Sequence, residues 1–545
     1  MPQRKDSRIE NSSLANGSRR RFLGGLGAAG LVVAAPALLR APGPAWAGEP
    51  ASRSSVFTLG VASGDPRAES VMLWTRLAPD PLNGGGMGGR PVEVKWRVAL
   101  RPDMSHVVCG GEATAHPSNG HAVLVNADGL APDTWYYYQF EYHGERSRIG
   151  RTRTFPARGT LPGEMRFALV SCQDYQAGYY AAYRDIAAQD LDFVVHVGDY
   201  IYEYAGNPAA PEARRHTGGE TVTVEDYRNR YALYRLDPQL QQAHALFPFI
   251  VTWDDHEVDN NYAALIPEDD QTFEAFRQRR ANAYQVYRET MPLRPNVRDR
   301  QDSMNLYRRL RFGDLAEFQV LDTRQYRTDQ PCNDGLQVLQ ACPQILDAAA
   351  TLLGEEQEAW LFRNLRNSRA VWNVLAQQVM MMRWDLGVLT GQPVNLFNVD
   401  AWDGYQVARD RIMRFLAEEQ IPNTVVLTGD IHSSWAADLK SNFADLNSPV
   451  VGAELVCSSV ASVFGDSNHF LVQATLPSNS HIKLFDGLHR GYVLCSATPR
   501  DWKATFRAVQ RVADPVLTVP SADIALFDLA SFGLTAGTPG LVKLA

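Results

Sequence analysis

The stretch VVHVGDYIYEY (residues 194–204) joins a run of strand-forming residues to Gly-Asp and then to three tyrosines. Short apolar strands of this kind are typical of the buried sheet of an α/β protein. An aspartate at the carboxyl end of such a strand is a common position for a ligand or a catalytic group. The stretch therefore predicts a strand over residues 193–197 that presents Asp199 at the open edge of a sheet, with Tyr202 close behind it.

Three more predicted strands end in polar residues in the same way. Residues 166–170, 250–253 and 424–428 lead to Ser171-Cys172-Gln173, Asp254-Asp255-His256-Glu257 and Gly429-Asp430-Ile431-His432. Amphipathic helical stretches over residues 224–236, 272–291, 355–367 and 407–420 lie between the strands, which predicts a layered α/β domain. We expect the four strands to belong to one sheet, so that their polar ends converge on one crevice.

The residue types at these ends indicate a metal site. Carboxylates, imidazoles and thiolates are ligands of hard or borderline ions, and the expected ligands are Cys172, Asp199, Tyr202, Asp255, Asp430 and His432. Asp199 can bridge two ions by giving one oxygen to each. A phenol ionises near pH ~10, so a bound Tyr202 favours a trivalent ion, and Fe³⁺ is a known partner of tyrosinate.

Two neighbouring ions predict phosphoester hydrolysis. One ion lowers the pKa of a bound water, which then attacks phosphorus as hydroxide, and both ions stabilise the charge on the phosphoryl oxygens. The leaving group still needs a proton. His256 lies next to the expected ligand Asp255, so we expect it to be the general acid.

The first 47 residues have the features of an export signal. SRRRFL (residues 18–23) is a twin-arginine pattern, and it is followed by a weakly apolar segment and by Ala-Trp-Ala at residues 45–47. We expect cleavage after Ala47, delivery by the twin-arginine machinery, and a periplasmic or secreted location. The alternative is a buried N-terminal helix.

Residues 48–157 alternate strand formers with Gly, Pro, Asn and Asp, and the stretch from 130 to 155 is similar to parts of fibronectin-type β-sandwiches. We therefore expect a small all-β sandwich domain there, followed by a catalytic domain over residues 158–545. Beyond the N-terminal signal, no segment is long and apolar enough to be a transmembrane helix.

The net charge of the chain and the positions of two cysteines lead to two further expectations. Without residues 1–47 the chain has 46 Lys and Arg against 59 Asp and Glu, a net charge of −13. Such a surface argues against a stable nucleic-acid partner. Cys332 and Cys342 flank one short loop, and in an exported protein they are expected to form a disulfide.

The motifs together resemble the PhoD-type alkaline phosphatases, exported metallophosphoesterases related to purple acid phosphatases. The resemblance rests on GVASGDPRAESVMLWTRL, SCQDYQAGYYAAY, HVGDYIYEY, VTWDDHEVDNNY, FGDLAEFQVLDTRQYRTDQPC, LTGDIHSSW and HIKLFDGLHRGYV, in this order. It implies Fe³⁺ with Ca²⁺ as cofactors, with Cys172, Asp199 and Tyr202 at the iron. It leaves open which ion Asp255, Asp430 and His432 bind.

The expected reaction is hydrolysis of small-molecule phosphate monoesters, diesters or both, with release of phosphate. One alternative is a phosphodiesterase that acts on phospholipids, in the manner of phospholipase D, or on polymers. An alternative from another class is an exported binding module without catalysis. Arg324, in DTRQY, is either a ligand of the substrate phosphate or part of a structural ion pair. His196 is expected to be a core residue.

Overall fold

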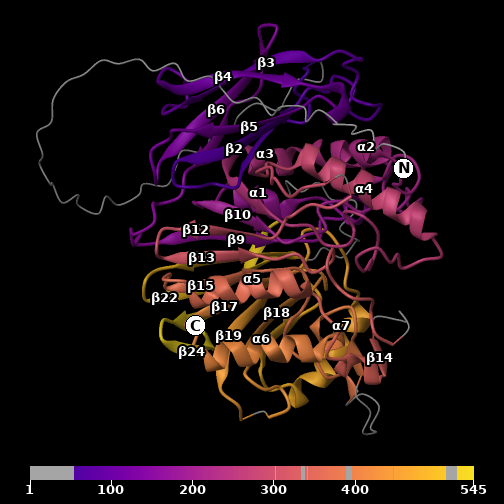
Figure 1. Ribbon diagram of the computed structural model, residues 1–545, viewed down its shortest axis with the longest axis vertical. Coiled ribbons are helices and arrows are strands. Elements are labelled where there is room, and N and C mark those ends of the chain that lie inside the picture. The colour runs from indigo at the N-terminus through magenta and orange to yellow at the C-terminus, as the bar shows by residue number, and fades with distance from the viewer. Residues whose placement is uncertain are drawn as a thin grey trace, which may run out of the picture.

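A computed structural model describes residues 55–300, 302–332, 338–340, 342–387, 396–445, 447–510 and 524–545 (Figure 1). The predicted export signal and its cleavage site at Ala47 lie outside these residues. Within the described ranges, none of the helices combines the length and the apolar character that a membrane span needs.

The larger of two central sheets has ten strands and contains three of the four predicted strands. Its order is β24 (Thr538–Lys543), β23 (Leu526–Thr535), β22 (Asp501–Val509), β21 (Gly491–Ala497), β9 (Met165–Val170), β10 (Phe193–His196), β11 (Pro248–Val251), β1 (Val61–Gly64), β2 (Ser70–Arg76) and β5 (Ala122–Asp128). Strands β9, β10, β11 and β1 run parallel. Their carboxyl ends therefore lie along the same edge.

The second central sheet has seven strands and contains the fourth predicted strand. Its order is β12 (Arg308–Phe312), β13 (Ala316–Val320), β15 (Trp372–Ala376), β17 (Thr424–Thr428), β19 (Val450–Val456), β18 (Ser434–Lys440) and β20 (Ile482–Asp486). The expectation that all four strands share one sheet is therefore wrong. Strand polarity and apolar composition do not reveal which sheet a parallel strand joins, and β17 pairs with β15 and β19 instead.

The two central sheets pack face to face around one apolar core. Phe167 of β9 and Val195 of β10 lie in the same cluster as Val374 of β15 and Val425 of β17. Because side chains alternate along a strand, the neighbouring residues point outward, toward helices. The molecule therefore has two sheets in the middle and helices outside, and both sheets bring strand ends to the same side.

Helices cover the outer face of each central sheet. The ten-stranded sheet packs against α1 (Ala181–Ala187), α2 (Val224–Arg235), α3 (Pro238–Leu246) and α4 (Phe273–Thr290). The seven-stranded sheet packs against α5 (Gly354–Arg366), α6 (Gln406–Glu418) and α7 (Asp466–Thr475). The four helices that the periodicity predicts are α2, α4, α5 and α6, each within two residues of the expected bounds.

The expected N-terminal β-sandwich is present, at one end of the molecule in Figure 1. A second layer of strands, β4 (Val107–Ala115), β3 (Val92–Ala99), β6 (Trp135–Tyr142), β7 (Glu145–Arg146) and β8 (Gly150–Arg153), shares an apolar core with β1, β2 and β5. Since β1 pairs with β11, one layer of this sandwich continues the large central sheet. The domain boundary at residue 157 stays a prediction.

A short ladder and a disulfide lie near the site side of the second sheet. Strand β14 (Val338–Gln340) pairs with β16 (Leu396–Asn398). Cys332 and Cys342 form a disulfide, which confirms the expected pairing. The other cysteines, Cys109, Cys172, Cys457 and Cys495, are free; all but Cys109 are buried, and Cys172 lies just after the end of β9.

Candidate metal centre

The predicted ligands lie where the strands of the two sheets end. Cys172 follows β9, Asp199 follows β10, Asp255 follows β11, and Asp430 and His432 follow β17. Four of these five have left-handed backbone conformations, with φ of 57° at Cys172, 58° at Asp199, 66° at Asp430 and 56° at His432. Residues other than glycine adopt this conformation at a cost, and it concentrates at functional sites.

Two glycines permit the close approach of these strand ends. Gly198, with φ of 116°, lies so close to Asp254 that an added Cβ would come within 2.4 Å of the Asp254 Cβ. A Cβ on Gly429 would come within 2.5 Å of the Ser171 Oγ. Close packing therefore requires glycine at both positions, because any side chain before Asp199 or Asp430 would separate the strand ends.

Three overlapping groups of side chains have the geometry to hold metal ions. In each group, one ligand atom per residue lies within 4.8 Å of the others: Cys172 with Asp199 and His432, Asp199 with Asp255 and His256, and Asp254 with Asp255 and Asp430. Asp199 belongs to two groups and Asp255 to two. This overlap is what a shared carboxylate between two ions requires.

Some carboxylate oxygens in these groups accept no hydrogen bond from the described residues and so are available to bind cations. Among the described residues, Asp199 Oδ1, Asp254 Oδ2 and Asp255 Oδ1 are buried and have no hydrogen-bond partner. Buried polar atoms are nearly always satisfied, and three orphaned carboxylate oxygens in one place need a positive ligand. The donor set of carboxylates, a thiol, a phenol and imidazole therefore fits metal ions.

Tyr202 lies in the same cluster, as the spacing after Asp199 predicts. Its hydroxyl donates to Asp199 Oδ2 at 3.0 Å, lies 3.0 Å from His432 Nε2, and accepts a hydrogen bond from the Ser462 Oγ at 2.7 Å. Burial and the charge of Asp199 raise the pKa of the Tyr202 phenol well above its usual value, and burial likewise raises the pKa of Cys172. Phenolate and thiolate would therefore need a bound cation here.

His256 is held tightly beside the cluster. Its Nδ1 lies 2.8 Å from Glu203 Oε2, its ring stacks on Tyr202 at 4.1 Å between centroids, and Tyr204 approaches its edge at 5.2 Å. Burial acts to lower the pKa of His256, but the negative charges of Glu203, Asp255 and Asp199 outweigh it and raise the pKa well above its usual value. A protonated imidazole is therefore stable at this position.

Arg324 lies beneath the cluster and is fully buried. Its guanidinium donates to Asp254, to both oxygens of Asp400 at 2.8 and 2.9 Å, and to Asp430 at 3.2 Å. These bonds favour the ion-pair alternative over phosphate binding, because the guanidinium is enclosed by carboxylates.

The pKa values of the other candidate ligands shift in different directions. Burial raises the pKa of Asp199, and burial together with Asp400 raises the pKa of Asp430 to about 7. Burial would also raise the pKa of Asp255, but Arg324 and His256 outweigh it and lower the pKa. Burial and the charge of His256 lower the pKa of His432 to about 4. His432 is thus neutral near pH 7, the form in which imidazole binds metals.

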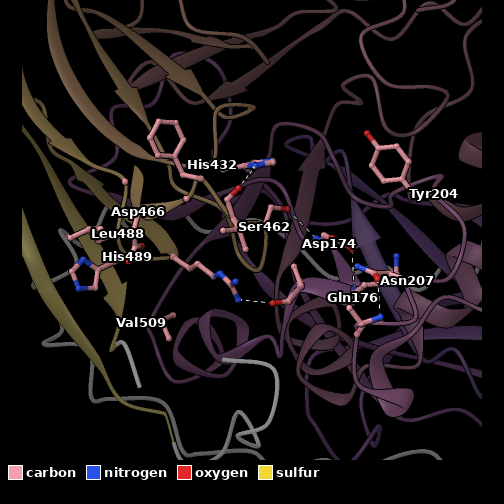
Figure 2. A pocket seen from close by; sticks show the side chains of 18 of the residues that line it. Asp174, Gln176, Tyr204, Asn207, His432, Ser462, Asp466, Leu488, His489 and Val509 are labelled. Atoms are coloured by element: carbon pink, nitrogen blue, oxygen red, sulfur yellow. Dashed lines mark hydrogen bonds between the residues drawn. The ribbon is translucent and has the colours of Figure 1, made fainter. Parts of the chain in front are cut away.

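A cavity of about 750 Å³ opens beside the cluster. Figure 2 shows His432 and Ser462 at its centre, with Asp174, Gln176, Asn207 and Tyr204 on one side and Asp466, Leu488 and His489 on the other. Arg490 also lines it and donates to the Ala177 carbonyl at 2.8 Å. The cavity is large enough for an organic group as well as a phosphate.

Sequence reasoning missed several contacts. Glu203 and Glu257 were not singled out, although Glu257 accepts hydrogen bonds from the backbone N–H groups of Asp199, Tyr200 and Asp254 and so ties β10 to β11. Ser462 was missed as well, since it comes from a loop 260 residues away from Tyr202. His196 is buried, as expected of a core residue.

Comparison of the chain with known proteins identifies the family that it matches. Residues 167–506 match the PhoD-like phosphatase family, and residues 43–156 match the N-terminal domain of PhoD-like phosphatases. The chain is 48% identical over 492 residues to alkaline phosphatase D of Bacillus subtilis (strain 168), which covers 90% of this chain and 82% of that relative.

Solved structures of phosphatases share the fold of this chain. A structure of PhoD superposes with a TM-score of 0.84 at 46% identity, over 91% of this chain and 94% of that one. Purple acid phosphatase PPD1 of yellow lupin (Lupinus luteus) has a TM-score of 0.54 at 12% identity, over 87% and 74% of the two chains, which shows a shared fold.

The fold and the acid-rich cluster at the strand ends therefore define a metallophosphoesterase-type phosphoric ester hydrolase, a small β-sandwich followed by a layered α/β domain. More specifically, the chain belongs to the PhoD-like phosphatase family. The alternative of a binding module without catalysis is excluded by this membership.

Proposed function

We propose that this centre binds Fe³⁺ and Ca²⁺ and hydrolyses phosphate monoesters, diesters or both. The observation that carries the proposal is the set of three orphaned oxygens on Asp199, Asp254 and Asp255, beside a thiol and a phenol. Cys172, Tyr202 and His432 would hold the ferric ion together with Asp199, because soft and phenolic donors favour a transition metal. Asp199, Asp255 and Asp430 offer oxygen ligands, which suit calcium.

When bound, the ions activate water and stabilise the negative charge that develops on the phosphoryl oxygens. The protein supplies the remaining functions. Asp199 and Asp255 would hold the ions beside the reacting phosphate, and His256, which has a ring nitrogen within 4.8 Å of a carboxylate oxygen of each, protonates the leaving oxygen. The cavity between Tyr204 and Arg490 holds the organic part of the ester.

The role of His256 is tested with two leaving groups. An alkoxide is a poor leaving group that needs a proton, whereas nitrophenolate leaves without one. General-acid help is worth ~10²–10⁴-fold, so His256→Ala should lose about that factor in kcat/KM on alkyl phosphates and much less on nitrophenyl phosphate. Its metal content should stay unchanged. If His256→Ala loses metal, or slows both esters equally, His256 is a ligand or a positioning group.

A phosphodiesterase that acts on phospholipids or on polymers remains the alternative substrate class. The volume of the cavity supports a substrate with a bulky organic group. Steady-state rates on a phosphate monoester, on its diester and on phosphatidylcholine vesicles separate these classes, and a monoester preference would count against the alternative.

We also propose export by the twin-arginine machinery to the periplasm or the medium. The twin-arginine pattern at residues 18–23, the weakly apolar segment after it and Ala-Trp-Ala at residues 45–47 support it. Arg19, Arg20 and Arg21 replaced together by Lys should leave the protein in the cytoplasm with residues 1–47 attached, as measured by fractionation and N-terminal sequencing. Normal processing of that variant would contradict the proposal.

A further inference from the structure

Three consecutive residues after the strand end enclose His256. Tyr202 stacks on one face of the imidazole and Tyr204 approaches its edge, while Glu203 between them bonds to Nδ1. Two hydrogen bonds to other segments anchor this backbone: the Tyr202 N–H donates to the Tyr234 hydroxyl oxygen at 3.1 Å, and the Thr221 N–H donates to the Glu203 carbonyl at 3.0 Å. The segment is therefore a rigid support for one histidine.

Glu203 receives two hydrogen bonds, one on each oxygen. Oε2 lies 2.8 Å from His256 Nδ1, and Oε1 accepts from the backbone N–H of Asn260 at 2.9 Å. A backbone N–H can only donate, so Oε1 must accept. The side chain is 1% exposed, so water does not compete for either oxygen.

We propose that Glu203 is a positioning residue that fixes the tautomer of His256, with a proton on Nδ1 and with Nε2 as the nitrogen available to the substrate. This rests on the proposed role of His256 as the proton donor. A donor at Nε2 returns to a neutral imidazole with its remaining proton on Nδ1, and Glu203 is the acceptor that this form needs. The Asn260 bond keeps the carboxylate from rotating away.

Because both carboxylate oxygens of Glu203 accept hydrogen bonds, its replacement by the isosteric glutamine should change the protonation of His256. In Glu203→Gln, the amide oxygen must serve the Asn260 N–H, so the NH₂ group faces His256 and forces Nδ1 to accept. The neutral ring then carries its proton on Nε2, which is the wrong tautomer. In Glu203→Ala, water can fill the space and Nδ1–H can persist. Glutamine should therefore be no better than alanine, the reverse of what packing alone predicts.

The test measures kcat/KM of Glu203→Gln, Glu203→Ala and Glu203→Asp on an alkyl phosphate and on nitrophenyl phosphate. We expect Glu203→Gln to lose about 10²-fold on the alkyl ester, Glu203→Ala to lose the same or less, and Glu203→Asp to retain the most, with small losses on the nitrophenyl ester. Metal content should match the wild type. Glu220→Gln is the matched control, because Glu220 lies in the same loop, half-exposed, and pairs with Arg279.

Three results would overturn the proposal: a Glu203→Gln enzyme as active as the wild type, one clearly better than Glu203→Ala, or equal losses on both esters. The variant His256→Ala distinguishes a failure of the positioning role of Glu203 from a failure of the proposed acid role of His256. If His256→Ala shows the leaving-group pattern and Glu203→Gln does not, the positioning role alone fails; if neither shows it, the proposed role of His256 fails.

A measurement on the unmodified protein decides the point even if the variants do not fold. Neutron diffraction from crystals of the metal-loaded enzyme locates the protons on His256. Density for a proton on Nδ1, directed at Glu203, is expected. A ring with its only proton on Nε2 would contradict the assignment.

Discussion

Asp199 and Asp400 are both buried aspartates near the same cluster, and the protein treats them in opposite ways. Asp400 receives two bonds from Arg324, one from Arg327 at 3.0 Å and one from Gln330. Asp199 receives one hydroxyl bond from Tyr202, and its Oδ1 has no hydrogen-bond partner among the described residues.

The pKa values follow this difference. Burial acts to raise the pKa of both groups. At Asp400 the charges of Arg324 and Arg327 outweigh burial and lower the pKa, whereas at Asp199 burial and the neighbouring carboxylates raise it. The comparison teaches that the fold supplies its own cations, Arg324 and Arg327, to Asp400 and leaves Asp199 to cations that bind from outside.

The largest effect is expected at Asp199. Asp199→Asn should lose bound metal and activity on every ester alike, because it removes the carboxylate that two candidate ion sites share. In chelated protein, however, Asp199→Asn should be at least as stable to urea as the wild type, since an unpaired buried carboxylate is unfavourable.

The pH dependence sharpens this expectation. Because burial raises the folded-state pKa of Asp199 above its unfolded value, the stability that this group contributes in the chelated wild type is lost as pH rises from about 4 upward. Asp199→Asn should lose less over the same range. Urea midpoints at several pH values, with and without chelator, measure this, and a variant that is less stable than chelated wild type at every pH would break the comparison.

The second effect is expected at Asp400. Asp400→Asn removes the carboxylate that pairs with the buried Arg327 and one of the four that surround Arg324, and breaking a buried pair in this way costs about 3–5 kcal/mol of unfolding free energy. The loss should appear with and without metal. Asp410→Asn is the control, because Asp410 is 44% exposed beside Arg409 and should change stability by less than about 0.5 kcal/mol. Equal effects of the two variants would show that Asp400 is not anchored as described.

The smallest effect on stability is expected at Tyr202. Tyr202→Phe removes the hydrogen bond to Asp199 and the one from Ser462, which should change the unfolding free energy of chelated protein by about 1–2 kcal/mol. In the loaded protein the same variant should shift or bleach visible absorption. Tyr175→Phe is the control, since the Tyr175 hydroxyl bonds to the Ala213 carbonyl, and it should leave the spectrum unchanged. A spectrum unchanged by Tyr202→Phe would remove Tyr202 from the ligand set.

Much of this arrangement could be predicted from local pattern. The four strands, the four long helices and the polar residues at the strand ends follow from apolar runs and from periodicity, which depend on neighbouring residues alone. The strand-end residues expected to converge do lie together, although β17 belongs to the other sheet; they are Cys172, Asp199, Tyr202, Asp255, Asp430 and His432.

The parts that pattern did not predict depend on contacts between distant segments. Glu203 meets His256 across 53 residues, and Arg324 meets Asp400 across 76. Neither pair has a spacing that a helix or strand would impose. The left-handed backbone at Cys172 and His432 was not foreseen either, because the surrounding tertiary structure holds these residues there.

The most direct test of the account is the metal content of the purified wild-type protein, measured together with its visible spectrum. The orphaned oxygens at Asp199 and Asp255, beside Cys172 and Tyr202, predict bound iron and calcium and a charge-transfer band from thiolate or tyrosinate to Fe³⁺. Chelation should abolish activity, and Ca²⁺ should restore it better than Mg²⁺. A colourless, active protein that contains only zinc or magnesium would contradict the account.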